Sequence, residues 1–201
     1  MKKIALIALL LAVCVAAGRA QESRQDFSLS GTGLIEPFIG SSTDVYVSAN
    51  RAFGALASYR FMMTPSFAIE GNYGITYQNK IHYKAYPNNY TVLARTQEAS
   101  GAFVRSFNYH KFNPFVEGGG GAFIFLPILN SGTTTHDTKQ QLEIGALYGG
   151  GIAYEISPSF DIRAEYRGII TKVPTFGVSQ FSTNGKWYNI YEPTVGVAYH
   201  F

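Results

Sequence analysis

The stretch that decides the fold is the last one, residues 190–201, which reads IYEPTVGVAYHF. Its odd-numbered positions, from Tyr191 to Phe201, are almost all apolar or aromatic, while its even-numbered positions are mostly small or polar. Side chains alternate between the two faces of a β-strand, so this pattern predicts a strand with one apolar face.

The same alternation recurs upstream, and helical periodicity is weak. It predicts an all-β chain with eight strands, near residues 33–41, 50–62, 66–78, 92–107, 113–126, 141–156, 159–172 and 189–201. Their lengths suit strands that cross a bilayer at a tilt, which need ~9–11 residues plus extensions.

The segments between the predicted strands alternate strictly between short and long. The short ones are 63–65, 108–112 and 157–158, and Pro65 and Pro158 mark turns in two of them. The long ones are 42–49, 79–91, 127–140 and 173–188. A meander with tight turns on one side and long loops on the other is typical of an eight-stranded antiparallel up-and-down transmembrane barrel.

Residues 1–20 are predicted to be a cleaved signal peptide. A basic start, Lys2-Lys3, is followed by an apolar run to Ala17 and by small residues flanking Arg19. The alternatives are a membrane anchor, for which the run is short, and a lipoprotein at Cys14, which Val13 disfavours. The predicted organisation is then a lead-in over 21–32 and a barrel over 33–201.

Cleavage after Ala20 changes the charge balance. It removes three basic residues, which leaves 13 basic against 13 acidic residues, so the basic character of the whole chain gives no reason to expect nucleic-acid binding. It also removes the single cysteine, which excludes a disulfide scaffold.

The charged faces of the predicted strands hold Arg and Glu in balance and almost no Lys, which favours a buried, ion-paired interior over a solvated face. An eight-stranded barrel is just wide enough to be filled by such side chains. One interior charge network is therefore expected, of Glu36, Arg60, Glu70, Arg105, Glu117, Glu155, Arg163, Glu165, Arg167 and Glu192. Glu98 is an exception, since it falls on a face that otherwise reads as apolar.

Four segments resemble the small outer membrane β-barrel domain family, of the OmpA-like and OmpX-like kind: NPFVEGGGG at 113–121, GGGIAYEIS at 149–157, the strand 163–167, and PTVGVAYHF at 193–201. The resemblance implies an outer membrane location among lipids and lipopolysaccharide. It also implies that Tyr199 and Phe201 form the C-terminal signal read by the barrel-assembly machinery. Family members of this size act as structural proteins, adhesins or small pores.

An envelope-structural or adhesin-like role without enzymatic activity is the leading interpretation, with exposed loop aromatics as a possible surface for an extracellular partner. A narrow solute channel is the first alternative, in which Gly119, Gly121, Gly149 and Gly151 leave an interior gap instead of serving close packing. A lipid A-modifying enzyme is the second. None of the four histidines, His82, His110, His136 and His200, sits mid-strand beside a serine on the same face, so no catalytic residue is assigned. No spacing predicts a metal or cofactor site.

Overall fold

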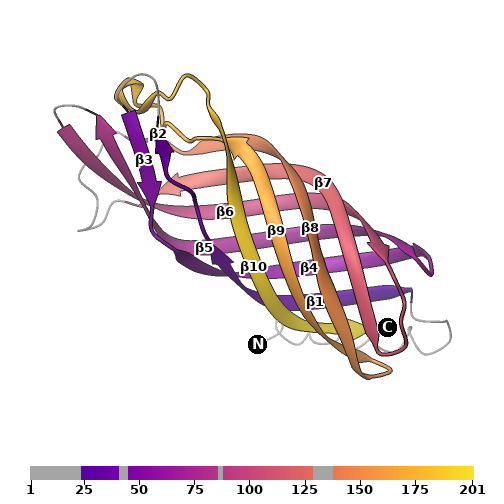
Figure 1. Ribbon diagram of the computed structural model, residues 1–201. Helices are drawn as coiled ribbons and strands as arrows, with labels where there is room; N and C mark the ends of the chain where they lie inside the picture. The colour runs from indigo at the N-terminus through magenta and orange to yellow at the C-terminus, as the bar shows by residue number, and fades with distance from the viewer. Residues whose placement is uncertain (1–23, 41–44, 86–87, 129–137) are drawn as a thin grey trace, which may run out of the picture.

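The computed structural model describes residues 24–40, 45–85, 88–128 and 138–201 (Figure 1). The predicted signal peptide and His136 lie outside these residues. Eight strands form the barrel wall: β1 (Gln25–Leu34), β4 (Ala52–Thr64), β5 (Phe67–Ala85), β6 (Asn88–Ser106), β7 (Phe112–Pro127), β8 (Gln141–Ser157), β9 (Phe160–Lys172) and β10 (Trp187–His200).

The wall is closed and wholly antiparallel. Each strand pairs with its neighbour along the chain, while the first and last strands pair with each other from Asp26↔His200 to Thr32↔Thr194. Closure leaves no unpaired strand edge in the wall, which is the condition for a sheet to sit in lipid. The predicted architecture and strand number are therefore confirmed.

The first strand is not where the sequence analysis placed it. β1 begins at Gln25, so the predicted lead-in is wrong from that residue onward, and the predicted 33–41 strand is displaced. Asp26, Ser28, Ser30 and Thr32 point inward and are buried. Polar inward positions made this strand look like a loop, because a barrel interior accepts the side chains that a soluble core excludes.

The predicted loop 79–91 is also largely strand. β5 and β6 run on as a hairpin beyond the barrel, β3 (Val45–Ala49) pairs with β5, and β2 (Ile39–Gly40) pairs with β3. Figure 1 shows this four-stranded extension, here called the ribbon, projecting at the upper left. It lies at the end with the long connections, here called the loop end.

The opposite, turn end has short connections, including the turn at Pro65-Ser66 and that at Pro158-Ser159. The long connection between β9 and β10 contains one short 3₁₀ turn, η2 (Ser179–Phe181). No helix among the described residues is long and apolar enough to cross a membrane.

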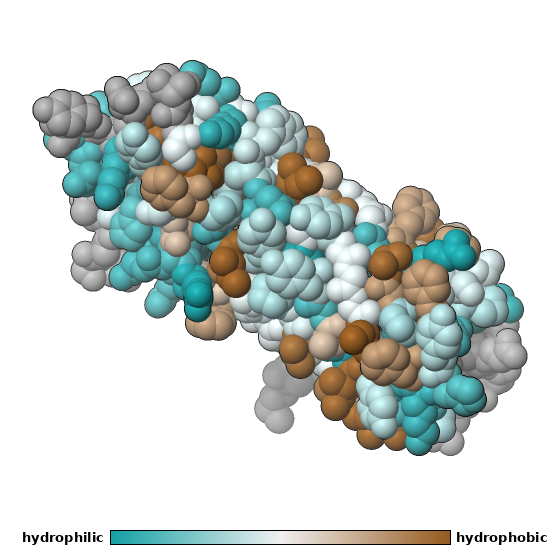
Figure 2. All heavy atoms as spheres, in the orientation of Figure 1, coloured by the Kyte–Doolittle hydropathy of each residue, from teal (hydrophilic) through white to brown (hydrophobic). Residues whose placement is uncertain are grey.

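The two faces of the wall differ in chemistry. Large apolar side chains such as Phe53, Phe103, Ile144 and Val195 are exposed on the outside. In Figure 2 brown and pale residues extend along the wall, while strongly hydrophilic residues gather towards the two ends of the molecule. An exposed apolar exterior is unfavourable in water and suits a lipid surround.

Candidate functional site

The centre of the barrel interior is organised around Arg167 on β9, which is fully buried. Its guanidinium nitrogens lie 2.5 Å from a Glu98 oxygen and 2.8 Å from a Glu192 oxygen. Its Nε lies 3.4 Å from Glu117 and 3.5 Å from Glu165. These four carboxylates come from β6, β7, β9 and β10, so barrel closure brings them to one arginine.

A second group of charges lies nearer the turn end. Arg60 contacts Glu70 at 2.6 Å, and Arg163 contacts Asp26 at 3.1 Å and Glu70 at 3.7 Å. Both guanidinium groups also lie over the ring of Phe115, at 4.7 Å and 5.8 Å from its centroid. Glu70 therefore joins the two arginines, and the aromatic ring fills the space between them.

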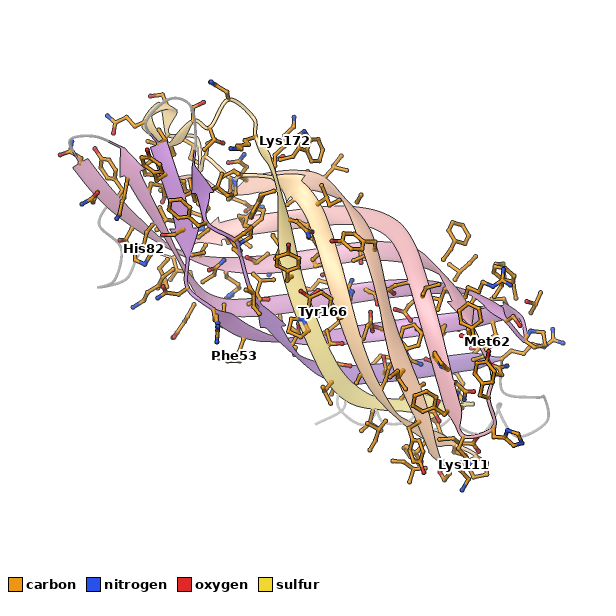
Figure 3. The ribbon with its side chains drawn as sticks, in the orientation of Figure 1. Phe53, Met62, His82, Lys111, Tyr166 and Lys172 are labelled. Carbon is orange, nitrogen blue, oxygen red and sulfur yellow. The ribbon has the colours of Figure 1, made fainter. Side chains whose placement is uncertain are left out.

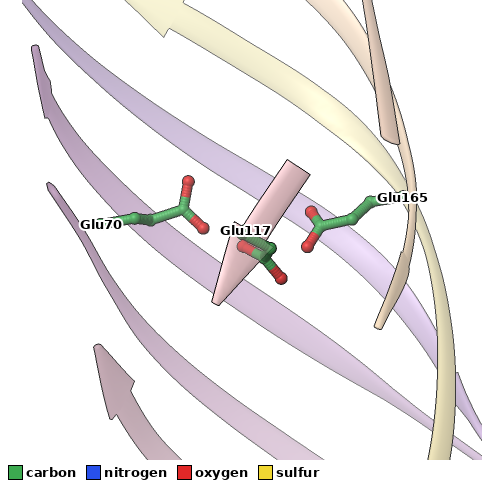
Figure 4. Close-up of side chains that lie close together, drawn as sticks. All are labelled: Glu70, Glu117 and Glu165. Atoms are coloured by element: carbon green, nitrogen blue, oxygen red, sulfur yellow. The ribbon is translucent and has the colours of Figure 1, made fainter. Parts of the chain in front are cut away.

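The two groups meet at three carboxylates. Glu70, Glu117 and Glu165 are buried, and one oxygen from each lies within 4.8 Å of the others (Figure 4). Neither oxygen of Glu117 accepts a hydrogen bond. Such a cluster can share protons or hold a cation, and it is the described group whose donor atoms and spacing fit a metal ion.

Acidic groups outnumber basic ones in this interior. Seven carboxyl groups are buried, and Asp161 pairs with His200. The other six, of Asp26, Glu70, Glu98, Glu117, Glu165 and Glu192, face only the three guanidinium groups of Arg60, Arg163 and Arg167. Buried charge is costly unless it is paired. The surplus negative charge is concentrated at Glu117 and Glu165, whose contacts with Arg167 are longer than those of Glu98 and Glu192.

Seven of the ten predicted network residues are brought together: Arg60, Glu70, Glu117, Arg163, Glu165, Arg167 and Glu192. Three are not. Arg105 is exposed on the outer face, where it stacks on Phe67 and Phe107. Glu155 lies near the turn end and lines the cavity there.

Glu36 belongs to a separate site at the loop end, where it accepts a hydrogen bond from Asn79 Nδ2 at 2.5 Å. Glu36 lies in the connection after β1. Asn79 lies on β5, two residues past Tyr77, which is the last aromatic residue on the outer face of that strand. Burial raises the pKa of Glu36 to about 7, against the opposing effect of the Asn79 amide.

Sequence reasoning missed two members, Asp26 and Glu98. Asp26 was hidden in the misplaced lead-in. On β6, the inward face holds Glu98 and the outward face holds Arg95 and Arg105. The signal was position within the predicted strand 92–107, because both arginines lie near an end of that range and stack on aromatic rings, whereas Glu98 is near its middle and faces inward.

The four interior glycines of β7 and β8 do not leave a gap. A Cβ on Gly119 would lie 2.0 Å from the Gly101 carbonyl oxygen, and one on Gly149 would lie 2.7 Å from Glu117 Oε1. Gly121 and Gly151 are equally crowded, by Ser100 and Phe115. These glycines allow close approach of neighbouring strands and side chains, which is the packing interpretation.

The loop end of the interior is apolar. A single buried cluster, here called the plug, takes residues from every strand and from η2. Tyr83 stacks on Phe181 at 4.2 Å and meets the edge of Phe176 at 6.4 Å, and its hydroxyl donates to the Pro174 carbonyl at 2.7 Å. The plug lies on the loop-end side of the charge layer and includes the buried side chains of the ribbon.

The turn end, in contrast, is open to a polar cavity of about 290 Å³. It is lined in part by Arg60, Glu155 and Arg163, and by a His200–Asp161 pair 2.8 Å apart. Of the other two described histidines, His110 also lines this cavity, from a turn, and His82 lies on the ribbon.

The residues predicted to form the assembly signal lie on the outside of the same end. Tyr199 stacks between Phe160 and Phe201, with centroid distances of 5.0 Å and 6.0 Å. The Phe201 amide donates to the Gln25 carbonyl at 3.0 Å. The end of the last strand is thus an aromatic edge next to the first strand.

Charge is segregated between inside and outside. No acidic side chain in the described ranges is exposed. The exposed Lys and Arg side chains in those ranges are Arg24, Arg51, Lys80, Lys84, Arg105, Lys111, Lys139, Lys172 and Lys186. Six of the nine lie at the loop end, beyond or at the edge of the apolar wall, and Figure 3 labels two, Lys111 at the turn end and Lys172 at the loop end.

Comparison with known proteins places this architecture. The OprG outer membrane protein of Pseudomonas aeruginosa superposes with a TM-score of 0.63 at 9% identity, covering 90% of this chain and 97% of OprG. Neisserial surface protein A gives 0.58 at 14% identity, with 89% and 98% covered. The attachment invasion locus protein Ail of Yersinia pestis, solved in complex with the heparin analogue sucrose octasulfate, gives 0.55 at 14%, with 90% and 100% covered.

At these identities the likeness shows the fold. No curated protein sequence matches the chain. The sequence model for the outer membrane protein beta-barrel domain, however, matches residues 5–201, which include all eight strands of the wall. The chain belongs to the outer membrane protein beta-barrel domain family and is a protein of the outer membrane.

Proposed function

We propose that this barrel is a non-enzymatic surface protein that acts by binding anionic groups at its extracellular end. In outer membrane barrels the long connections face the cell exterior and the tight turns face the periplasm. The loop end is then extracellular. The observation that carries the proposal is the charge segregation: exposed cations gather at that end, and no exposed acid opposes them in the described ranges.

The interior supports binding over transport. The plug packs across the extracellular half with fully buried rings such as Phe123, Phe125 and Phe181. Beneath it the ion-paired layer around Arg167 fills the middle. A solute channel would need both layers to open, so the structure favours the surface role over the channel alternative.

The relatives fit the same role. Ail was solved with a sulfated sugar bound. Transferred to this chain, that observation suggests that its own cationic loop end can take a polyanion. We also propose that Tyr199 and Phe201 mediate recognition by the barrel-assembly machinery, because their rings are accessible at the periplasmic edge of the last strand.

The function is tested on refolded protein whose gel mobility shifts on boiling. Heparin should bind with an affinity that falls steeply with salt, and neutral dextran should not bind. The same sample should show no conductance steps in planar bilayers. Discrete steps would favour the channel alternative, absence of any polyanion binding would contradict the proposal, and altered lipid A masses on expression in a suitable host would favour the enzyme.

A further inference from the structure

The outward face of β5 changes character at one residue. Along the barrel wall it presents Tyr73 and Tyr77, both exposed. At Gln78, which has φ 57°, the β5–β6 register shifts, so that the next outward positions are even-numbered. A bulge of one residue reverses which side chains face out. Lys80, His82 and Lys84 therefore continue the aromatic stripe outward, as Figure 3 shows for His82.

The neighbouring strands of the ribbon complete this surface. On β3, Tyr46 lies opposite Lys84, and Ser48 lies opposite His82. Phe38, which precedes β2, stacks on Tyr46 with a centroid distance of 5.9 Å and an interplanar angle of 19°, and it is 67% exposed. We call this surface the ribbon face; it consists of Phe38, Tyr46, Ser48, Lys80, His82 and Lys84.

The ribbon face combines three kinds of group. Two ammonium groups offer charge to phosphate, and a pair of stacked rings offers a flat apolar platform. The Ser48 hydroxyl and the Nε2 of His82, whose Nδ1 is bonded to Thr91 Oγ1 at 3.0 Å, offer hydrogen bonds. Together they suit a negatively charged saccharide, whose ring faces are partly apolar and whose substituents are polar or anionic.

The distance of the two lysines from the aromatic residues of the barrel wall identifies the source of that saccharide. Lys80 is three residues beyond Tyr77, or roughly 10 Å along a strand and about 7 Å in height at a tilt near 45°. Lys84 is a further ~13 Å along the strand. A side chain just outside the aromatic girdle meets lipid phosphates, and one further out meets the sugars attached to them.

The direction of the face points to the same source. It continues the lipid-facing side of β5 and so faces sideways, along the leaflet, and not upward from the cell. We infer that the ribbon face binds the phosphorylated saccharide headgroup of the lipopolysaccharide that surrounds the barrel. This inference rests on the proposed function and names the partner that the ribbon face contacts.

The test uses the double variant Lys80→Gln/Lys84→Gln in refolded, gel-shifting protein. The matched control is Lys139→Gln/Lys172→Gln, which removes the same charge from the same end at residues outside the ribbon. Binding of purified lipopolysaccharide, of its dephosphorylated form and of heparin is measured by titration. The ribbon variant should bind lipopolysaccharide about thirtyfold more weakly than the parent, and the control should stay within about twofold.

Dephosphorylated lipopolysaccharide should bind parent and ribbon variant alike, and Phe38→Ser/Tyr46→Ser should weaken binding without changing its salt dependence. Equal lipopolysaccharide binding by the ribbon variant and the parent would overturn the inference. Loss of heparin binding alone would also overturn it, since the site would then serve a free polyanion while the proposed function stands. Failure of the parent to bind any anionic ligand would instead remove the proposed function.

Discussion

Glu117 is the residue at which the interior carries more charge than its partners balance. Its carboxylate faces two others and accepts no hydrogen bond, whereas Glu192 holds Arg167 at 2.8 Å and accepts a hydrogen bond from Thr32. Glu117→Gln should therefore stabilise the folded barrel by roughly 1 kcal/mol, because it removes a buried charge without a close partner. Urea unfolding in lipid vesicles measures the difference.

The matched variant is Glu192→Gln, which should destabilise by about 1–3 kcal/mol because it weakens a close contact of a buried arginine. If Glu117→Gln destabilised the barrel as much as Glu192→Gln does, the Glu117 charge would have to be balanced by a group such as a bound cation. Adding a chelator to the parent would then lower its stability to that of the variant.

Glu36 predicts a dependence of stability on pH. Its pKa rises from 4.5 to about 7 on folding, so the folded protein holds this proton more tightly than the unfolded chain does. The contribution to stability is complete below pH 4.5 and is lost as the pH rises through 7. Glu36→Gln should be neutral near pH 4 and stabilising near pH 8, by at most roughly 3 kcal/mol. A pH-independent effect in the same unfolding assay would contradict this.

The bulge in β5 determines which side chains of the ribbon face the plug and which face outward. Deleting Gln78 would return Ile81 and Tyr83 to the outside and turn Lys80, His82 and Lys84 towards the plug. The deletion should destabilise by more than ~3 kcal/mol and expose the ribbon to protease. Gln78→Gly keeps the bulge and relieves a left-handed backbone, so it should retain or raise stability by up to about 1 kcal/mol.

Strand pattern alone predicted the wall well and the ribbon poorly, for reasons visible in single residues. Strands such as β9 alternate cleanly between Arg or Glu inside and Ile or Tyr outside. This alternation predicted the strands of the wall and, across them, seven residues of the interior network. β1 was not predicted, because the Ser and Thr at its inward positions are residues typical of a loop. The extension of β5 was not predicted, because the bulge at Gln78 breaks the alternation of apolar and polar residues. Periodicity alone does not reveal a single inserted residue.

The sequence predicted most of the residues that form the interior charge network, but not which of them pair with one another. Arg167 meets Glu98 and Glu192 because eight strands close at one register, and register depends on all the strand pairs together. Arg105 lies in a strand with other charged residues, yet its stacking on Phe67 near the turn end holds it on the outer face.

Beyond residue 20 the chain has 13 basic and 13 acidic residues, and this balance conceals a radial order. Carboxylates lie inside the barrel with three arginines, and lysines lie outside, mostly at the extracellular end. Arg suits the interior because its fork reaches several carboxylates at once, and Lys suits a solvated or headgroup contact as a compact point charge. The same composition with Lys and Arg exchanged would satisfy neither place.

Closure of the wall also separates the role of Phe201 in assembly from its role in stability. Its ring contacts Tyr199 at the periplasmic edge, and its amide makes one hydrogen bond to Gln25, beyond a β1–β10 ladder that runs from Asp26↔His200 to Thr32↔Thr194. Deleting Phe201 should therefore lower the amount of heat-modifiable barrel in the outer membrane severalfold, while refolded protein loses only about 1 kcal/mol of stability. Tyr188→Phe, in the plug, is the matched control for an aromatic change in the same strand. Equal membrane insertion of the deletion variant and the parent would argue against an assembly role for this residue, whereas a large loss of stability in the refolded protein would make it a structural one.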